Sequence, residues 1–278
     1  MSLFNMPDWL RILLVVLTCT SFVPQLYLLV IRHGNVSGIS LNYVFLNLVV
    51  ATELFAMSFL FTVNLVQRSD LFVHNPPNAG DWINMANFAV IWVLWLVIFL
   101  VCVAYYRREN LCLATAVVVA YVSILMISIV PLVFEVIANA NEPSSDQRWF
   151  DTIFHQIHAL FIAPLVTLLA LPAFLVQVRG VLARPLGSGT GALSLTGLAL
   201  QTVVFAVLAA TWWPGRLVYD WPSTSFVTWD QLVGFVPINH AVFVLGQALL
   251  LVVAEWHRRR GRCDGEGISG ETQPLIAS

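Results

Sequence analysis

The stretch "TSFVPQLYLLVIRHGNVSGISL", Thr20 to Leu41, places a Pro–Gln pair inside an apolar run. A proline inside a helix removes the hydrogen bond to the carbonyl four residues earlier and bends the helix. Pro24 would free the carbonyl of Thr20, which in lipid must find a donor or else face protein or water. The neighbouring amide of Gln25 is the donor we expect. The stretch therefore predicts a bent membrane helix, a small-residue turn and a second helix.

The composition is typical of an integral membrane protein. Of its 278 residues, 59% are hydrophobic and 10% are charged, whereas soluble domains carry about 25% charged residues. A helix needs about 20 mostly apolar residues to cross a bilayer core of ~30 Å. The sequence therefore predicts an all-α integral membrane protein with seven spans, at residues 9–31, 39–64, 86–106, 111–138, 153–178, 193–213 and 233–256.

The arginines predict the orientation of the spans. Alternate links and the C-terminal segment carry most of them, namely Arg32, Arg107, Arg108, Arg179, Arg184, Arg258, Arg259, Arg260 and Arg262. Cytosolic links of membrane proteins carry an excess of basic residues. We therefore expect the N-terminus in the lumen or outside and the C-terminus in the cytosol. Residues 1–265 then form one membrane domain, and the polar, glycine-rich segment 258–278 forms a disordered cytosolic tail.

The features of the opening stretch occur twice, in residues 22–47 and 170–201. Each copy holds a mid-helix proline, an arginine, a turn with glycine, a Ser–Leu pair and then an amide; the corresponding pairs are Pro24 and Pro172, Arg32 and Arg179, Ser40 and Ser194, and Asn47 and Gln201. Both copies run in the same direction, which is typical of parallel transporter repeats. The chain is thus predicted to divide into a three-helix repeat (9–106), a linker helix (111–138) and a second three-helix repeat (153–256). This division argues against a G-protein-coupled receptor.

With these two motifs the sequence resembles the PQ-loop family, whose clan includes cystinosin, the vacuolar and lysosomal cationic amino-acid exporters and the SWEET sugar carriers. The first motif, Pro24-Gln25 followed by "GNVSGISL", matches well, whereas the second keeps Pro172 but has Ala173 in place of glutamine. The resemblance implies alternating access, in which the two three-helix halves rock about Pro24, Gln25 and Pro172.

Glu53 lies midway along the second predicted span. A charged side chain at that depth costs roughly 2.5–3.5 kcal/mol on insertion scales and indicates function by default. We expect Glu53 to carry a proton or contact substrate. Asn47 falls on nearly the opposite helix face, so one of the two should face a cavity and the other a helix interface. Asn47 can equally make an ordinary interhelical bond.

Asp151, His155 and His158 share one helical face at the non-cytosolic mouth of the fifth span. Histidine titrates near pH 6.5, so His158 is a second candidate for proton coupling. The alternative is a histidine pair that is simply solvated at the interface.

Further substrate candidates come from the third helix of each predicted repeat. In the sugar carriers that this chain resembles, asparagines on that helix bind substrate, which implies such a role for Asn87 and Asn239 here. His240 lies beside Asn239, and Gln201 is the amide of the second motif. These side chains complete the set of candidates for binding substrate or a proton.

The C-terminal segment holds Glu271, Leu275 and Ile276 in the arrangement of an acidic dileucine sorting signal. Adaptor complexes read such signals on cytosolic tails, which predicts adaptors as partners and a vacuolar, lysosomal or endosomal membrane as the location.

Three functions fit these features. The first is a carrier for an amino acid or another small polar metabolite, with proton coupling left open. The second is an intramembrane enzyme of the terpene-cyclase type that uses Glu53, although Asn239 and His240 stand where a partner carboxylate is expected. The third is a solute receptor that does not transport. We assign no catalytic residue, metal ligand or cofactor, and the near-neutral net charge of −2 argues against a nucleic-acid partner.

Overall fold

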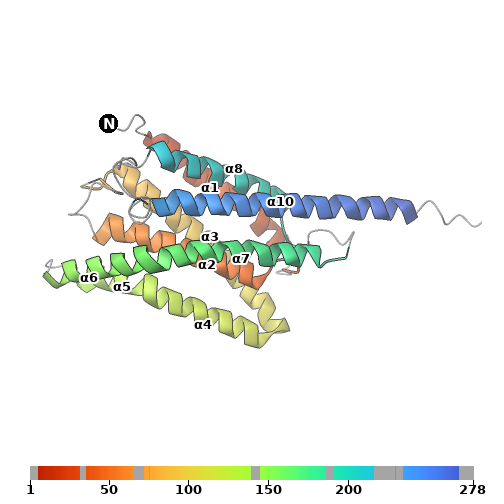
Figure 1. Ribbon diagram of the computed structural model, residues 1–278, viewed down its shortest axis with the longest axis horizontal. Coiled ribbons are helices and arrows are strands. Elements are labelled where there is room, and N and C mark those ends of the chain that lie inside the picture. The colour runs from red at the N-terminus through yellow and green to blue at the C-terminus, as the bar shows by residue number, and fades with distance from the viewer. Residues whose placement is uncertain are drawn as a thin grey trace, which may run out of the picture.

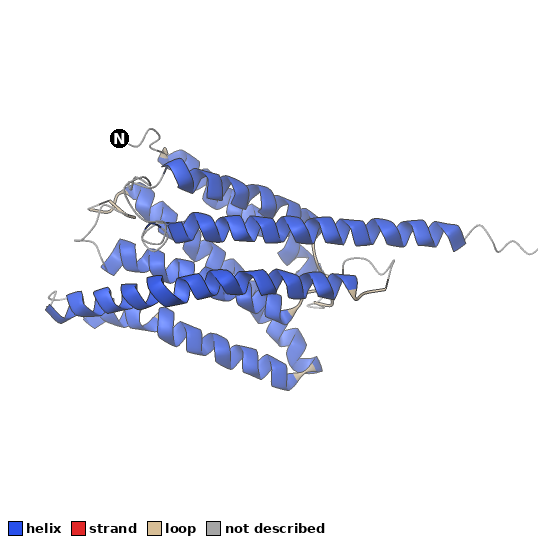
Figure 2. Ribbon diagram, in the orientation of Figure 1, coloured by secondary structure: helices blue, strands red, loops and turns tan. Residues whose placement is uncertain are grey.

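The computed structural model describes residues 6–31, 36–64, 72–74, 76–138, 145–185, 191–215, 229 and 234–268. This part of the chain is a bundle of helices without strands (Figures 1 and 2). Seven helices are long and apolar enough to cross a membrane, which confirms the predicted class; they are Asp8–Ile31, Leu41–Asn64, Ala79–Glu109, Leu111–Ala138, Trp149–Leu182, Leu195–Trp212 and Phe235–Gly261.

The helices carry the labels of Figure 1. The elements, in chain order, are α1 (Asp8–Ile31), α2 (Leu41–Phe59) continued by the π-helix η1 (Leu60–Asn64), α3 (Ala79–Glu109), α4 (Leu111–Ser128), α5 (Val130–Ala138), α6 (Ser145–Ile157), the π-helix η2 (His158–Ile162), α7 (Ala163–Leu182), α8 (Leu195–Gly215) and α10 (Phe235–Ile268).

Two helix boundaries differ from the sequence prediction for local reasons. The third span begins at Ala79 rather than near residue 86, because Asn78 and Asp81 form a capping box that satisfies the first free N–H groups. The seventh helix extends to Ile268, so it includes the first part of the segment predicted as a tail. The predicted sorting residues Glu271, Leu275 and Ile276 lie outside the described residues.

Prolines lie where the fourth and fifth spans depart from regular α-helix. Pro131 lies at the start of α5, where the helix from Leu111 is interrupted at Ile129. Pro164 lies at the start of α7, and it has no N–H to bond to the preceding turn. The turn before it is wide: the N–H of Ala163 donates to the carbonyl of His158, five residues earlier. Such π-turns frequently occur at functional sites, and η2 begins with a candidate residue.

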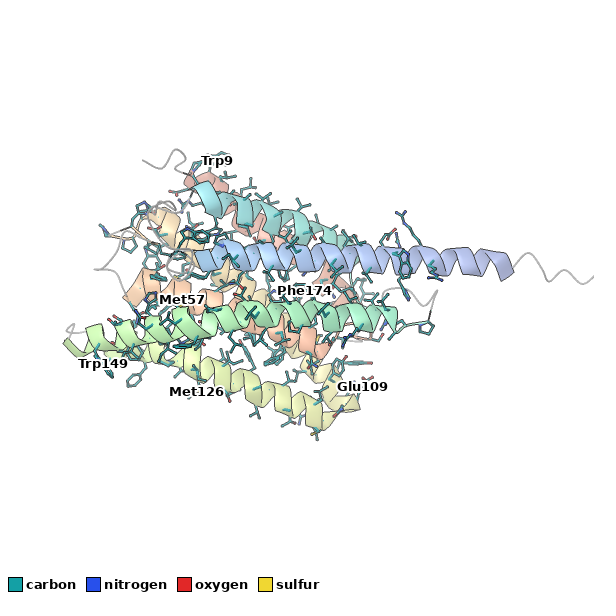
Figure 3. The ribbon with its side chains drawn as sticks, viewed as in Figure 1. Trp9, Met57, Glu109, Met126, Trp149 and Phe174 are labelled. Carbon is teal, nitrogen blue, oxygen red and sulfur yellow. The ribbon has the colours of Figure 1, made fainter. Side chains whose placement is uncertain are left out.

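The packing of the helices has the same form in the first three spans and the last three. Helix α3 packs against both α1 and α2, and α10 packs against both α7 and α8. Between these groups, α2 packs on α7 and α1 packs on α8, while α4 lies against α2 and α3. Large apolar side chains project outward all round, as Trp9, Met126 and Trp149 do in Figure 3, whereas Phe174 is buried.

The successive spans run in opposite directions, so their links gather at two ends. We name the "turn end" after the segments 36–40 and 191–194, which precede α2 and α8. We name the "loop end" after the segments 72–74 and 76–78, which precede α3.

Candidate functional site

Gln25 connects the first motif to the second half of the chain. Its Nε2 donates to the carbonyl of Ala192 at 2.8 Å, and its Oε1 accepts from the N–H of Ser194 at 2.9 Å. One side-chain amide thus binds both a donor and an acceptor of the turn before α8. The expectation that Gln25 would donate to the carbonyl of Thr20 is wrong, since its Nε2 points across the helix interface and donates to Ala192 instead.

Gln177 makes the same contacts in the reverse direction. Its Nε2 donates to the carbonyl of Gly38 at 2.6 Å, and its Oε1 accepts from the N–H of Ser40 at 2.7 Å. Each half of the molecule therefore holds the turn of the other half through one buried glutamine of its first helix.

This geometry corrects the register of the second motif. Gln177, not position 173, is the counterpart of Gln25, so Val176 stands in the place of Pro24 and Pro172 lies one helical turn earlier. The paths to the next serine, 25 to 40 and 177 to 194, then differ by two residues. Sequence reasoning missed Gln177 because it anchored the alignment on the proline. The glutamine-to-serine spacing could have found it.

The two turns also touch directly. The N–H of Ala192 donates to the carbonyl of Ser37 at 2.8 Å. Gly38 and Gly191 have φ values of 103° and 66°, in the region that favours glycine. The guanidinium of Arg184 packs against both, and a Cβ at Gly38 would lie 2.7 Å from it. These close approaches leave the turn end closed.

Between the ends, an aromatic cluster fills the middle of the bundle. The ring of Trp95 makes edge contacts with Phe22, Tyr43 and Phe243, with centroids 5.6, 5.7 and 6.1 Å apart. Phe205 adds a contact to Phe243 at 4.4 Å. The cluster joins helices from both halves, and Trp95 lies between two cavities.

The first cavity lies on the loop-end side of Trp95, and we call it the asparagine cavity. It is narrow, with a volume of about 20 Å³, which is room for about one water molecule. Its polar lining consists of three predicted residues, Asn47, Asn239 and His240, and Trp95, Phe205 and Phe243 are among its apolar walls. Among the described residues that line it, none carries a fixed charge.

Asn87 lies on the same face of α3 as Ile91, which lines the asparagine cavity. The side chain of Asn87 is buried, and both its nitrogen and its oxygen lack a hydrogen-bond partner. Asn239 is held by a donation from Thr167 at 3.0 Å and itself donates to the carbonyl of Phe235. A buried amide that is not satisfied calls for water or a ligand.

The second cavity lies on the turn-end side of Trp95, and we call it the glutamine cavity. It is equally narrow, with a volume of about 20 Å³, and is lined by Gln25, Tyr43 and Gln201 together with Trp95 and apolar residues. Gln247 of α10 donates to both the Tyr43 hydroxyl and the Gln201 oxygen at 3.0 Å. Gln201 is thus at a helix junction that borders this cavity, and not in the asparagine cavity.

Glu53 and His158 form a buried pair. His158 Nδ1 lies 2.7 Å from Glu53 Oε1, and the hydroxyl of Ser128 donates to Glu53 Oε2 at 3.2 Å. The ring of Phe154 stacks on His158 at 3.9 Å. Glu53 does not line either cavity described above; it faces α4 and η2, whereas Asn47 on α2 lines the asparagine cavity. Of the two polar faces predicted for the second span, the one with Asn47 therefore lies at the cavity, and the one with Glu53 lies at a helix interface.

The other two members of the predicted histidine face lie close to this pair in the chain. Asp151 is buried, and the ring of His155 packs edge-on against Phe61 at 5.3 Å. The Nε2 of His155 is buried without a hydrogen-bond partner. The solvated histidine pair that was the alternative is not what the structure shows.

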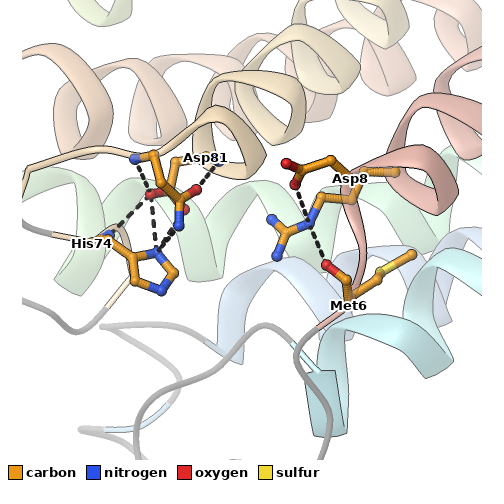
Figure 4. Close-up of polar contacts among 6 residues, drawn as sticks. Met6, Asp8, His74 and Asp81 are labelled. Atoms are coloured by element: carbon orange, nitrogen blue, oxygen red, sulfur yellow. Dashed lines mark hydrogen bonds and ion pairs between the residues drawn. The ribbon is translucent and has the colours of Figure 1, made fainter.

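The loop end is closed by aromatic rings. Phe72 stacks on Trp212 and Phe235, each with centroids 5.5 Å apart, and lies 5.0 Å from Phe61. The segment is anchored at the start of α3, where Asp81 accepts hydrogen bonds from the N–H of His74 and lies 3.1 Å from its Nδ1 (Figure 4).

The comparisons with known proteins agree with the motif. A family model described as the PQ loop repeat matches residues 7–67. That range contains α1, the first turn and α2, and the match confirms the predicted resemblance to the PQ-loop family. No curated protein and no solved structure matches the chain.

Proposed function

We propose that this chain, which carries a PQ-loop repeat at residues 7–67, is a membrane transporter for a small polar solute that works by alternating access. The observation that carries the proposal is the reciprocal closure by Gln25 and Gln177. Helices α1 and α7 each bind the turn of the other half. Opening of the turn end must therefore break both sets of hydrogen bonds together.

The strength of this closure suits a reversible gate. Four glutamine bonds and the Ala192–Ser37 bond cross the turn end. Each is worth about 0.5–1.5 kcal/mol net, or roughly 5 kcal/mol together. A solute that binds the open state about 10⁴-fold better than the closed state supplies that difference. The hydrogen bonds therefore keep the turn end closed at rest, and binding of a solute is sufficient to open it.

The asparagine cavity, widened when the two halves move apart, is the proposed solute site. Its amides and its imidazole offer hydrogen bonds, and its aromatic walls cover apolar faces of a ligand. Because the described lining carries no fixed charge, a charged group would lose hydration without gaining a partner. We therefore favour a solute whose buried part is uncharged, within the broader class of small polar metabolites.

Proton coupling is assigned to Glu53 and His158. The pair joins α2 to η2, and Ser128 ties it to α4. Protonation of Glu53 would remove its charge and weaken the contact between α2 and the start of α7. Since the pair lies outside the asparagine cavity, coupling would act through the movement of helices and not through direct contact with the solute.

The enzyme alternative finds less support in this geometry. A cyclase acid must face the substrate, yet Glu53 is occupied by His158 and Ser128 on the other side of α2. The three side chains do not form a hydrolytic triad either, because Glu53 lies between the serine and the histidine instead of behind the histidine.

The proposed location of the protein rests on its C-terminal segment. We place it in a vacuolar, lysosomal or endosomal membrane, with the C-terminus in the cytosol, on the basis of Glu271, Leu275 and Ile276 and the arginine bias. An adaptor complex would recognise the three residues there.

The test is uptake of a pooled metabolite library into proteoliposomes, driven by a pH gradient. We expect wild type to accumulate a discrete solute and Glu53→Gln to lose the pH dependence of that uptake. Glu109→Gln, an exposed acid at the end of α3, serves as the matched control. If folded wild type accumulates nothing but its melting temperature rises with a member of the pool, the protein is a receptor and the carrier proposal is wrong.

A further inference from the structure

The glutamine cavity has no role in the function proposed so far. It is as large as the asparagine cavity, and the two share one wall, the ring of Trp95. Edge contacts to Phe22, Tyr43 and Phe243 hold that ring. Such contacts are individually weak and contain no hydrogen bond, so a rotation of this one side chain would join the two spaces.

The chemistry of the glutamine cavity resembles that of the first. Its polar lining is two amides and a phenol, from Gln25, Gln201 and Tyr43, and none of the described lining residues is charged. Next to it, the Oε1 of Gln247 is fully buried without a hydrogen-bond partner, while its Nε2 binds Tyr43 and Gln201. Each side of Trp95 thus has a buried amide with unused hydrogen-bonding capacity, Asn87 on one side and Gln247 on the other.

Gln25 gives this cavity a connection to the gate. The same side chain lines the cavity and holds Ala192 and Ser194 of the second turn. A hydroxyl or amide in the cavity would compete with the turn for the Gln25 amide. Its arrival would therefore loosen the turn end.

We propose that the glutamine cavity is a second solute site, for an uncharged hydrogen-bonding solute, entered from the asparagine cavity when Trp95 turns aside. Its occupant takes hydrogen bonds from Gln25 and so releases the turn of residues 191–194. This inference rests on the proposed carrier function, and it adds the step that links solute position to gate opening.

The test uses two cysteines on α2 of the full chain in lipid nanodiscs, Val44→Cys in the glutamine cavity and Ala51→Cys in the asparagine cavity. Both native residues are buried cavity-lining side chains. The probe is 2-hydroxyethyl methanethiosulfonate, an uncharged reagent that leaves a tethered hydroxyl, and modification is followed by peptide mass spectrometry. We expect Trp95→Ala to speed modification at Val44→Cys several-fold and to leave the rate at Ala51→Cys unchanged. Equal rates at Val44→Cys with and without Trp95 would overturn the assigned route.

The second readout is hydrogen exchange of the peptide that contains residues 191–196, measured on modified Val44→Cys. We expect the tethered hydroxyl to raise exchange there, whereas the propyl adduct, of similar size but without a hydroxyl, leaves it unchanged. Equal exchange for the two adducts would show that Gln25 does not sense the occupant and would refute the proposal. Neither readout requires a known solute. If both expected results are obtained but the protein takes up no solute, the carrier function is wrong. If the protein takes up solute but neither result is obtained, only the second site is wrong.

Discussion

The two ends of the bundle are closed by different kinds of interaction. At the turn end, Gln25 and Gln177 bind main-chain groups of the opposite half. At the loop end, Phe72 stacks among rings from three other elements. Hydrogen bonds are directional and fail over a short displacement, whereas ring packing tolerates sliding. We infer that the turn end opens in one step and the loop end by gradual loosening.

The largest expected effect comes from removing the glutamine contacts. The double variant Gln25→Leu, Gln177→Leu leaves four main-chain groups without their glutamine partners, two of them buried and two half-buried. An unsatisfied buried group costs about 1–3 kcal/mol, so we expect the free energy of unfolding to fall by about 4 kcal/mol. Denaturant titration in detergent measures the loss, and hydrogen exchange of residues 36–40 should rise. Thr20→Val, which removes only an exposed bond within α1, is the control. Unchanged exchange at the turns would show that the glutamines do not close this end.

Phe72→Ala removes the equivalent contact at the loop end. A buried phenylalanine truncated to alanine costs about 3–5 kcal/mol in cores, and we expect the lower value because Phe72 lies in a connecting segment. The same titration measures the loss. Exchange should rise at the start of α3 but not at residues 36–40. Phe72→Leu keeps most of the volume and should lose much less; an equal loss would argue against ring packing as the closure.

Gly38→Ala examines the close approach of the two turns. The φ of 103° and the nearby Arg184 guanidinium make a Cβ unfavourable, by about 1–2 kcal/mol for the backbone conformation. The variant should shift the equilibrium toward an open turn end, which faster thiol labelling of Val44→Cys would report. Gly180→Ala is the control, because a Cβ there meets nothing within 4 Å, and it should leave the labelling rate unchanged. If Gly180→Ala and Gly38→Ala gave the same labelling rate, the contact between the turns would not be what keeps this end closed.

Tyr121→Phe should have the smallest effect. Its hydroxyl accepts from Trp92 at 2.9 Å and lies 3.3 Å from the Thr52 hydroxyl, so it ties α4 to α2 and α3. Loss of these bonds should cost about 1 kcal/mol, measured as a lower melting temperature, with no change of exchange at either end. Opening of the turn end in this variant would mean that the linker helix also takes part in gating.

Local patterns were sufficient for the spans and for the family resemblance. Apolar runs of adequate length gave seven helices, and Pro24-Gln25 with its turn identified the PQ-loop repeat that the family match confirms. Asn47 and Asn239 were candidates for substrate binding, and both line the asparagine cavity; their role there stays a prediction. These features depend on helix length and on the face that a residue occupies, which are properties of neighbouring positions in the chain.

Tertiary structure alone decided the partners of the buried polar side chains. Gln177 pairs with a turn nearly 140 residues away, and Glu53 meets His158 and Ser128 at separations of 105 and 75 residues. A buried amide or carboxylate takes whatever complementary group the packing brings within about 3 Å. The sequence by itself determined which segments cross the membrane and which faces are polar, because both follow from helix periodicity. Only the packing of the two halves on each other decided that Gln25 and Gln177 close the turn end and that Glu53 lies outside the asparagine cavity.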